Sequence, residues 1–182
     1  MRRPKRVRVP LCSVIIKPSF HEERIRAMTQ RVVVPDIQAL PDFVGVELGP
    51  SSWVTVSQGR IDDFARATGD DQWIHVDQER AKRESPFGNT VAHGYLTLSL
   101  SSTLLPEIFE VQNSSHIVNY GVDKVRLREP VPAESRLRLS GHLQSVRSVT
   151  GGAARVIISL SYEVENARRA VCTAEGIYIY FP

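Results

Sequence analysis

Two short segments of the chain hold the residues best suited to acid–base chemistry. The first contains Asp70 and His75, a carboxylate and an imidazole five residues apart, just past a helix expected over residues 58–68. A turn can bring such a pair to one point, where it could position a water molecule and pass protons near neutral pH. The spacing alone leaves a second interpretation open, because His75 stands between two apolar residues, where a histidine usually has a structural role.

The second segment is Ala92-His93-Gly94, which precedes a stretch with almost no charged residues. If a buried helix begins near Gly94, its free backbone N–H groups and positive dipole end could stabilise a developing oxyanion. A glycine there would also let a thioester carbonyl approach closely. The alternative is that Gly94 only allows tight packing. For His93 we expect a structural role, because nothing else at metal-ligand spacing accompanies it and His75.

The elements that must position these residues can be predicted from periodicity. Apolar residues recur at helical spacing over residues 58–68, with Ser57 as a suitable N-cap and Gly69 as the end of the helix. Residues 70–89 are mostly polar, contain Pro86 and Gly88, and are not expected to form one regular element.

The second half of the chain has a different pattern. Residues 91–105 predict a buried helix that ends before Pro106, because the stretch lacks a charged face. Strands are expected at 53–56, 117–127, 135–146, 154–165 and 170–181. One buried helix followed by four long strands at hairpin spacing predicts an α+β fold in which an antiparallel sheet curls around the helix, and periodicity alone leaves the order of the strands open.

The two chemical segments together resemble the signature of the MaoC-like hydratases. Gly69-Asp70-x-x-x-Ile74-His75, followed by Ala92-His93-Gly94-x-Leu96, is similar to Gly-Asp-x-Asn-Pro-(Leu/Ile)-His and a later (Ala/Val)-His-Gly. The resemblance extends over residues 53–181 and is greatest to the nodulation-protein-N-like branch. Gln72 and Trp73 depart from the wider pattern, where Asn and Pro are usual.

The resemblance implies a hot-dog fold and (R)-specific enoyl-CoA hydratase activity, with Asp70 and His75 activating the water and the Gly94 N–H binding the thioester oxygen. It also implies a supporting role for Ser102, which the residues alone do not distinguish from Ser99 or Ser101. Gln72 keeps an amide that can orient its neighbours, whereas the bulk of Trp73 is expected to narrow the acyl pocket. No metal or redox cofactor is implied, and coenzyme A enters as part of the substrate.

Lys124 and Arg126 are candidate contacts for the phosphates of coenzyme A, since both side chains suit phosphate oxygens. Alternatively, they form only the solvated face of a strand.

Three other functions remain open at this level. An acyl-CoA thioesterase would direct its water at the carbonyl carbon rather than at C3. A non-catalytic acyl-binding hot-dog subunit would keep the scaffold alone, although the presence of Asp70, His75 and Gly94 together argues against it. A dehydratase acting on hydroxyacyl thioesters would use the same catalyst in the opposite direction.

Composition limits the remaining possibilities. A chain of 182 residues is expected to form one domain, over residues 28–182, preceded by a basic tail over residues 1–27 or an over-long start. The tail holds eight of the 23 Lys and Arg residues, so the basicity does not indicate a folded nucleic-acid-binding face. No apolar run approaches the ~20 residues that span a bilayer, and Cys12 and Cys172 have no metal-site or disulfide pattern. We therefore expect a cytoplasmic protein with free thiols, and a homodimer, both by resemblance and because a single hot-dog unit leaves a sheet edge open.

Overall fold

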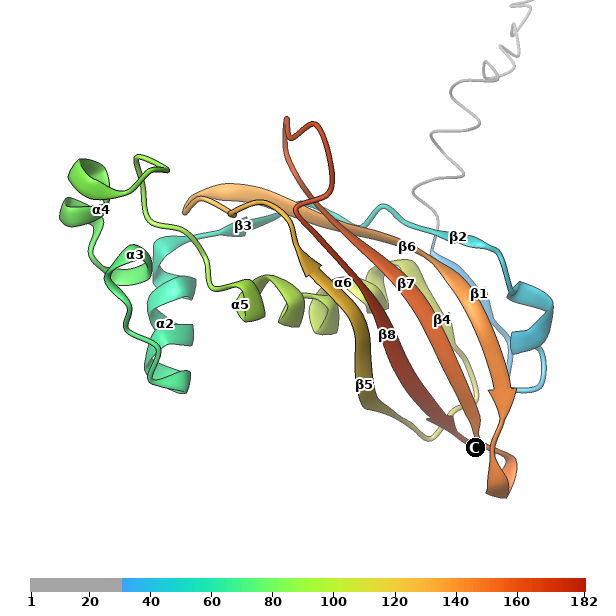
Figure 1. Cartoon of the computed structure of the whole chain (residues 1–182). Coiled ribbons are helices and arrows are strands. Elements are labelled where there is room, and N and C mark those ends of the chain that lie inside the picture. Colours follow the sequence, from blue (N-terminus) through green and yellow to red (C-terminus); the bar gives the residue numbers. More distant parts are fainter. Residues whose placement is uncertain (1–30) are drawn as a thin grey trace, which may run out of the picture.

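The computed structural model describes residues 31–182, so the predicted tail over residues 1–27 lies outside the described residues. Figure 1 shows a curved sheet with one helical segment along its inner side and a smaller helical group at one end. The strands are β1 (Val32–Val34), β2 (Glu47–Leu48), β3 (Val54–Val56), β4 (Phe109–Val111), β5 (His116–Leu127), β6 (Ser135–Ser148), β7 (Ala154–Val164) and β8 (Cys172–Phe181). The α-helices are α2 (Gln58–Thr68), α3 (Trp73–Val76), α4 (Gln78–Glu84), α5 (Gly94–Ser99) and α6 (Ser101–Ile108).

The main sheet has the strand order β2-β6-β7-β8-β5, and β3 also pairs with β6. All these pairings are antiparallel, and only the separate β1–β4 pair is parallel. The four long strands predicted from the sequence are therefore present and are joined by antiparallel pairing. The predicted α+β arrangement, with the sheet curled around a central helical segment, is confirmed.

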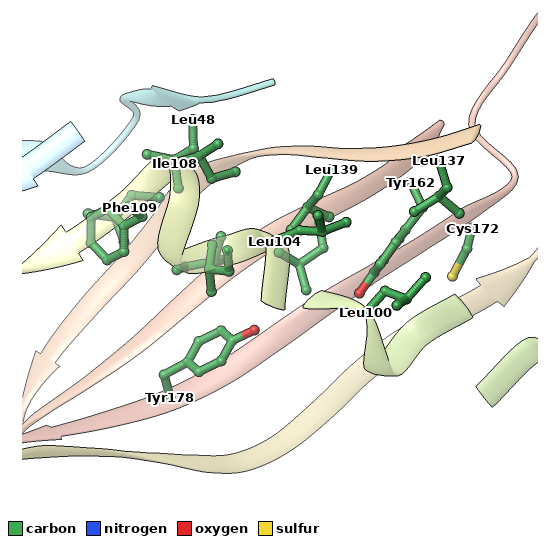
Figure 2. Packing of buried hydrophobic residues seen from close by; sticks show 14 of the residues in the cluster. Leu48, Leu100, Leu104, Ile108, Phe109, Leu137, Leu139, Tyr162, Cys172 and Tyr178 are labelled. Atoms are coloured by element: carbon green, nitrogen blue, oxygen red, sulfur yellow. The ribbon is translucent and has the colours of Figure 1, made fainter. Parts of the chain in front are cut away.

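The core lies between the concave face of the sheet and the segment α5–α6 (Figure 2). Along β7 every second side chain is buried, as expected for a strand with one face on the core. Tyr162 is fully buried there, and its hydroxyl donates to the carbonyl oxygen of Leu98 on α5 at 2.9 Å. Each fully buried aliphatic side chain contributes roughly 1.5–3 kcal/mol, so this layer fixes where the helix lies on the sheet.

The central helix differs from the prediction in three ways. It begins at Gly94 as expected, but Leu100 interrupts it, and the second part continues through Pro106 to Ile108. One face of the helix is also exposed, because Tyr95 keeps 75% of its surface accessible. The absence of charge had predicted burial on all sides, and one chain alone does not cover this face.

The segment 70–89 does not form one regular element, as predicted, and it holds two short helices, α3 and α4. Helix α2 has the predicted bounds. Ser57 caps it by accepting a hydrogen bond from the Arg60 N–H, and Gly69 ends it in the left-handed conformation, with φ at 76°. None of the helices among residues 31–182 is long and apolar enough to cross a membrane.

Strand β5 lies at an edge of the main sheet and is paired only with β8. Most of its residues are exposed, including five large apolar ones. These are Ile117, Val118, Tyr120, Val122 and Leu127. A long apolar edge strand is a surface on which another chain can pair.

Candidate active site

The structure brings Asp70 and His75 together at the ends of two helices. Asp70 follows the left-handed turn at Gly69, and His75 lies on α3, which begins three residues later. A carboxylate oxygen of Asp70 and one ring nitrogen each of His75 and His93 all lie within 4.8 Å of one another. The His75 side chain is buried, whereas 54% of the Asp70 side chain is accessible. Water can therefore reach the carboxylate while the imidazole is held within the protein.

His75 is oriented by a hydrogen bond between its Nδ1 and the carbonyl oxygen of Val91, at 2.6 Å. A carbonyl oxygen only accepts hydrogen bonds, so Nδ1 carries the hydrogen, and Nε2 of the neutral ring is left as an acceptor. An imidazole in this tautomer can take a proton from water through Nε2.

Val91 is itself fixed by α3 and by the segment between β5 and β6. Its N–H donates to the carbonyl oxygen of Ile74 at 3.0 Å, and it forms an isolated antiparallel bridge with Pro132. The next residue, Ala92, donates its N–H to the carbonyl oxygen of Val131 at 2.8 Å. The Pro130-Val131-Pro132 string thus aligns the chain that leads into Gly94.

His93 contacts both members of the candidate pair. Its Nε2 lies 2.9 Å from the main-chain oxygen of Asp70, and its ring stacks on that of His75 with 3.8 Å between ring centroids. Phe64 packs on the ring of His93, with 5.0 Å between centroids. His93 is buried as expected for a structural residue, but these contacts place it in the candidate site.

Gln58 is a member of this site that the sequence did not identify. Its side-chain N–H donates to the main-chain oxygen of His75 at 2.8 Å and to Asp62 at 2.7 Å, and its amide oxygen accepts from Thr90. The side chain of Gln72 is exposed, and Gln72 accepts the His75 N–H at 2.9 Å through its main-chain oxygen. The amide that braces His75 therefore comes from the first turn of α2, a link between residues 17 positions apart.

Gly94 is the first residue of α5 and lines a groove of about 340 Å³ together with Leu127 and Arg128. The first N–H groups of a helix have no partner within the helix, so they are free to bind an oxygen atom. A Cβ atom at this position would overlap the end of the Leu127 side chain. Both the predicted role of Gly94 in binding and its role in packing are therefore compatible with the geometry.

A second groove, of about 420 Å³, runs along the exposed face of the central helix between α2 and β5. Phe64, Tyr95, Val122 and Tyr178 provide much of its apolar surface, and Ser99, Ser101 and Ser102 all line it. Ser99 and Ser101 both donate to main-chain oxygens of α5, so Ser102 is the serine of the three that remains a candidate for contact with a ligand.

Trp73 lies outside the residues that line these two grooves, and the guanidinium of Arg80 covers its ring at 4.3 Å. The expected narrowing of the acyl pocket by Trp73 has no support in this arrangement. Phe64 and Tyr178 are better placed to limit the length of a ligand in the apolar groove.

The predicted basic residues occupy a third groove, of about 540 Å³, in which Lys124, Arg126 and Arg128 lie beside hydroxyl-bearing residues of β6, β7 and β8. Lys124 is paired with Glu175 at 2.8 Å, and this contact lowers the pKa of the Glu175 carboxyl through hydrogen bonding and charge. Arg128 also lines the groove at Gly94. Lys124 and Arg126 line only the third groove, so Arg128 is the basic residue that the two grooves share.

The same three side chains, Asp70, His75 and His93, are a candidate set of metal ligands. The two rings stack with an angle of 27° between their planes. Ring lone pairs lie in the plane of the imidazole, so nearly parallel rings direct them side by side rather than toward one ion. The arrangement suits proton transfer better than metal binding.

Comparison with known proteins identifies the family. The model of the MaoC-like domain matches residues 41–164, which include both chemical segments. The chain belongs to the MaoC-like family. It is 43% identical over 136 residues to 3-hydroxyacyl-thioester dehydratase Z of Mycobacterium tuberculosis, covering 75% of this chain and 89% of that protein. It is 44% identical over 146 residues to nodulation protein N of Rhizobium leguminosarum bv. viciae, covering 77% and 88%.

The solved structures similar to this MaoC-like protein include the (R)-hydratase from A. caviae, with a TM-score of 0.60 at 18% identity over 76% of this chain and 96% of that one. At this level of identity the similarity shows the hot-dog fold. The predicted fold and the predicted family are thus both confirmed.

Proposed function

We propose that this MaoC-like protein is an (R)-specific enoyl-CoA hydratase, which adds water reversibly to trans-2-enoyl-CoA and gives (R)-3-hydroxyacyl-CoA. The main observation behind the proposal is that the accessible Asp70 carboxylate lies within 4.8 Å of a ring nitrogen of His75. Nε2 of His75 is left free to accept a proton, because Nδ1 donates to Val91. A relative named as a 3-hydroxyacyl-thioester dehydratase supports it, because a catalyst of dehydration also catalyses hydration.

The proposed reaction uses the pair and the start of α5. Asp70 and His75 hold a water molecule and take one of its protons while its oxygen bonds to C3 of the substrate. The electrons of the double bond move to the thioester oxygen, where the Gly94 N–H stabilises the enolate. The pair then returns a proton to C2, so that the net change is the addition of one water molecule.

The grooves provide a place for each part of the substrate. Phe64, which packs on His93, also lines the apolar groove, so an acyl chain in that groove would begin beside the catalytic pair. We propose that Lys124 and Arg126, which line one groove, bind phosphates of coenzyme A, which is part of the substrate rather than a cofactor. The scheme requires no metal ion or redox cofactor.

We also propose a homodimer, in which a second copy pairs with the open edge of β5. The exposed face of the central helix and the apolar groove both border this edge. A second chain there would bury Tyr95, which is 75% accessible in the single chain, and would close the groove for an acyl chain.

Incubation with crotonyl-CoA tests the proposed activity. We expect loss of the enone absorbance without release of free thiol, and chiral analysis should identify the product as (R)-3-hydroxybutyryl-CoA. Thiol release with the enone intact would instead indicate a thioesterase, and no reaction with enoyl-CoAs of any chain length would favour a non-catalytic acyl-binding subunit.

The variant Asp70→Asn tests the mechanism. It removes the carboxylate charge and should lower kcat by at least about 100-fold, since acid–base groups contribute about 10²–10⁴-fold. The neighbouring exposed residue offers a matched control, and Asp71→Asn should retain activity. Equal activity in both variants, with unchanged folding by circular dichroism, would contradict the assignment of Asp70.

A further inference from the structure

We infer that His93 is a positioning residue that fixes Asp70 and His75 relative to each other. The inference rests on the proposed function for its kinetic consequence, but its structural part is independent of the reaction. A single buried ring, 3% accessible, contacts the main chain of Asp70 on one side and the imidazole of His75 on the other.

The contact with Asp70 fixes a residue that has few other restraints. Asp70 follows a helix end, and its side chain is 54% accessible. Among residues 31–182, its carboxylate has no hydrogen bond, and its N–H makes only a long one, of 3.4 Å, to Thr68 Oγ1. Within the described part of the chain, the 2.9 Å contact from His93 Nε2 to the Asp70 main-chain oxygen is thus the shortest polar contact that Asp70 itself makes. Nε2 also lies 3.9 Å from Asp70 Oδ2, so displacement of the turn would move the carboxylate.

The contact with His75 fixes the plane of the reacting ring. A single hydrogen bond through Nδ1 leaves the imidazole some freedom to tilt about its Cβ–Cγ bond, because the angle of a hydrogen bond can vary. Stacking on His93 at 3.8 Å removes this freedom and sets the direction in which Nε2 points. Errors of about 1 Å in such positions can cost roughly 100-fold in rate.

The unpaired nitrogen of His93 argues against a packing role alone. Because Nε2 meets a carbonyl oxygen it carries the hydrogen, and Nδ1 of the neutral ring is a buried acceptor. In the part of the chain that the structure describes, Nδ1 has no hydrogen-bond partner. A buried polar atom without a partner is unfavourable. Phenylalanine would fill the space between Phe64 and His75 without that disadvantage, so the donor at Nε2 is the property that an imidazole adds.

Three substitutions separate the donor from the ring. His93→Gln keeps an N–H donor at about the position of Nε2 but loses the ring. His93→Phe keeps a stacking ring but loses the donor, and His93→Asn places its donor nearer to the position of Nδ1. If His93→Phe does not fold, as judged by circular dichroism, His93→Asn can be compared with His93→Gln instead, because only His93→Gln keeps a donor near the position of Nε2.

We expect kcat for crotonyl-CoA to fall about 10- to 100-fold in His93→Phe and His93→Asn, the range typical when a supporting partner of a functional residue is lost. KM should stay within about threefold, because a positioning residue does not bind substrate. His93→Gln should recover at least half of the lost activity on a logarithmic scale. Unchanged kcat in His93→Phe would contradict the role of the contact with Asp70, and unchanged kcat in His93→Gln would contradict the role of stacking on His75. Unchanged kcat in both variants would overturn the inference.

A double substitution and an NMR measurement complete the test. If His93 acts through the pair, His93→Phe should slow the Asp70→Asn variant by less than about threefold, since residues that act as a unit are not additive. Backbone relaxation should show increased motion at residues 70–72 in His93→Phe and not in His93→Gln. This readout does not require turnover, so increased motion in a chain that fails to hydrate crotonyl-CoA would support the positioning role and contradict only the proposed function. Unchanged relaxation in His93→Phe would contradict the positioning role whatever the activity.

Discussion

At the scale of single residues, the candidate site depends on which polar atoms are already occupied. Nδ1 of His75 donates to the carbonyl oxygen of Val91, and Nε2 of His93 donates to the carbonyl oxygen of Asp70. Within Asp70 and His75, the side-chain atoms without a hydrogen-bond partner among residues 31–182 are the carboxylate oxygens and Nε2, and these are the groups that the proposed reaction uses. The main-chain oxygens thus determine which nitrogen of each ring carries a hydrogen before any substrate binds.

Gly94 provides a prediction at this scale. Gly94→Ala places a methyl group against the end of Leu127 and fills the groove beside the first N–H of α5. We expect kcat/KM for crotonyl-CoA to fall at least about 10-fold, with a loss of unfolding free energy of about 1–3 kcal/mol from overpacking. The double variant Gly94→Ala/Leu127→Ala restores the space and should regain stability. Activity in Gly94→Ala equal to wild type would argue against the proposed oxyanion contact.

The basic groove gives a second residue-scale prediction. Arg126→Gln should raise KM for crotonyl-CoA by up to about 10-fold and leave kcat unchanged, because a phosphate contact binds substrate and transition state equally. The same variant should match wild type with crotonyl-pantetheine, which lacks the nucleotide phosphates. Lys82→Gln, on α4 and away from the groove, is the control. A raised KM with both substrates would show that Arg126 does not act through a phosphate.

At the scale of elements, the turn between α2 and α3 connects helix stability to the site. Gly69 closes α2 with φ at 76° and directs the chain to Asp70. Gln58, at the other end of the same helix, braces the main chain of His75. One 11-residue helix therefore supports both members of the candidate pair.

A pair of glycine substitutions tests this role of α2. Gly69→Ala forces a side chain into a left-handed conformation and should lower the free energy of unfolding by about 1–2 kcal/mol. Gly59→Ala, in the same helix and without a positive φ, should raise it by up to about 1 kcal/mol. Urea unfolding measures both changes, and equal effects of the two substitutions would contradict the assigned turn.

At the scale of the whole molecule, the single chain leaves an apolar surface exposed at one edge of the sheet. The edge of β5, the exposed face of the central helix and the apolar groove lie next to one another. A second copy that buried this surface would pair with the free N–H and C=O groups of the edge strand and would also enclose an acyl chain.

The proposed dimer is tested by charges on that edge. Val118→Lys/Tyr120→Lys places two charges on exposed apolar positions of β5 and should convert a dimer to a monomer in light scattering. Activity should fall as the dimer is lost, because the acyl groove then lacks the side that the second copy would provide. Val149→Lys, exposed outside the strands, is the matched control and should stay dimeric. A wild-type chain that is monomeric and fully active would refute the proposal.

The sequence by itself determined the elements whose signals are local. Helix α2 follows from apolar spacing with a cap at each end, and the long strands follow from runs of strand-forming residues between turns. The paired segments at Asp70–His75 and Ala92–Gly94 were sufficient to indicate the family, which the comparisons confirm.

Only the tertiary structure decided how these residues act together. The contacts of His93 with Asp70 and His75, and that of Gln58 with the His75 main chain, join residues far apart in sequence, and no periodicity encodes such contacts. The same limit explains the error about the central helix. The lack of charge predicts that the apolar surface of the helix is buried. Whether its own sheet or another chain buries that surface depends on where the sheet ends. In this protein the sheet ends at β5, beside the site.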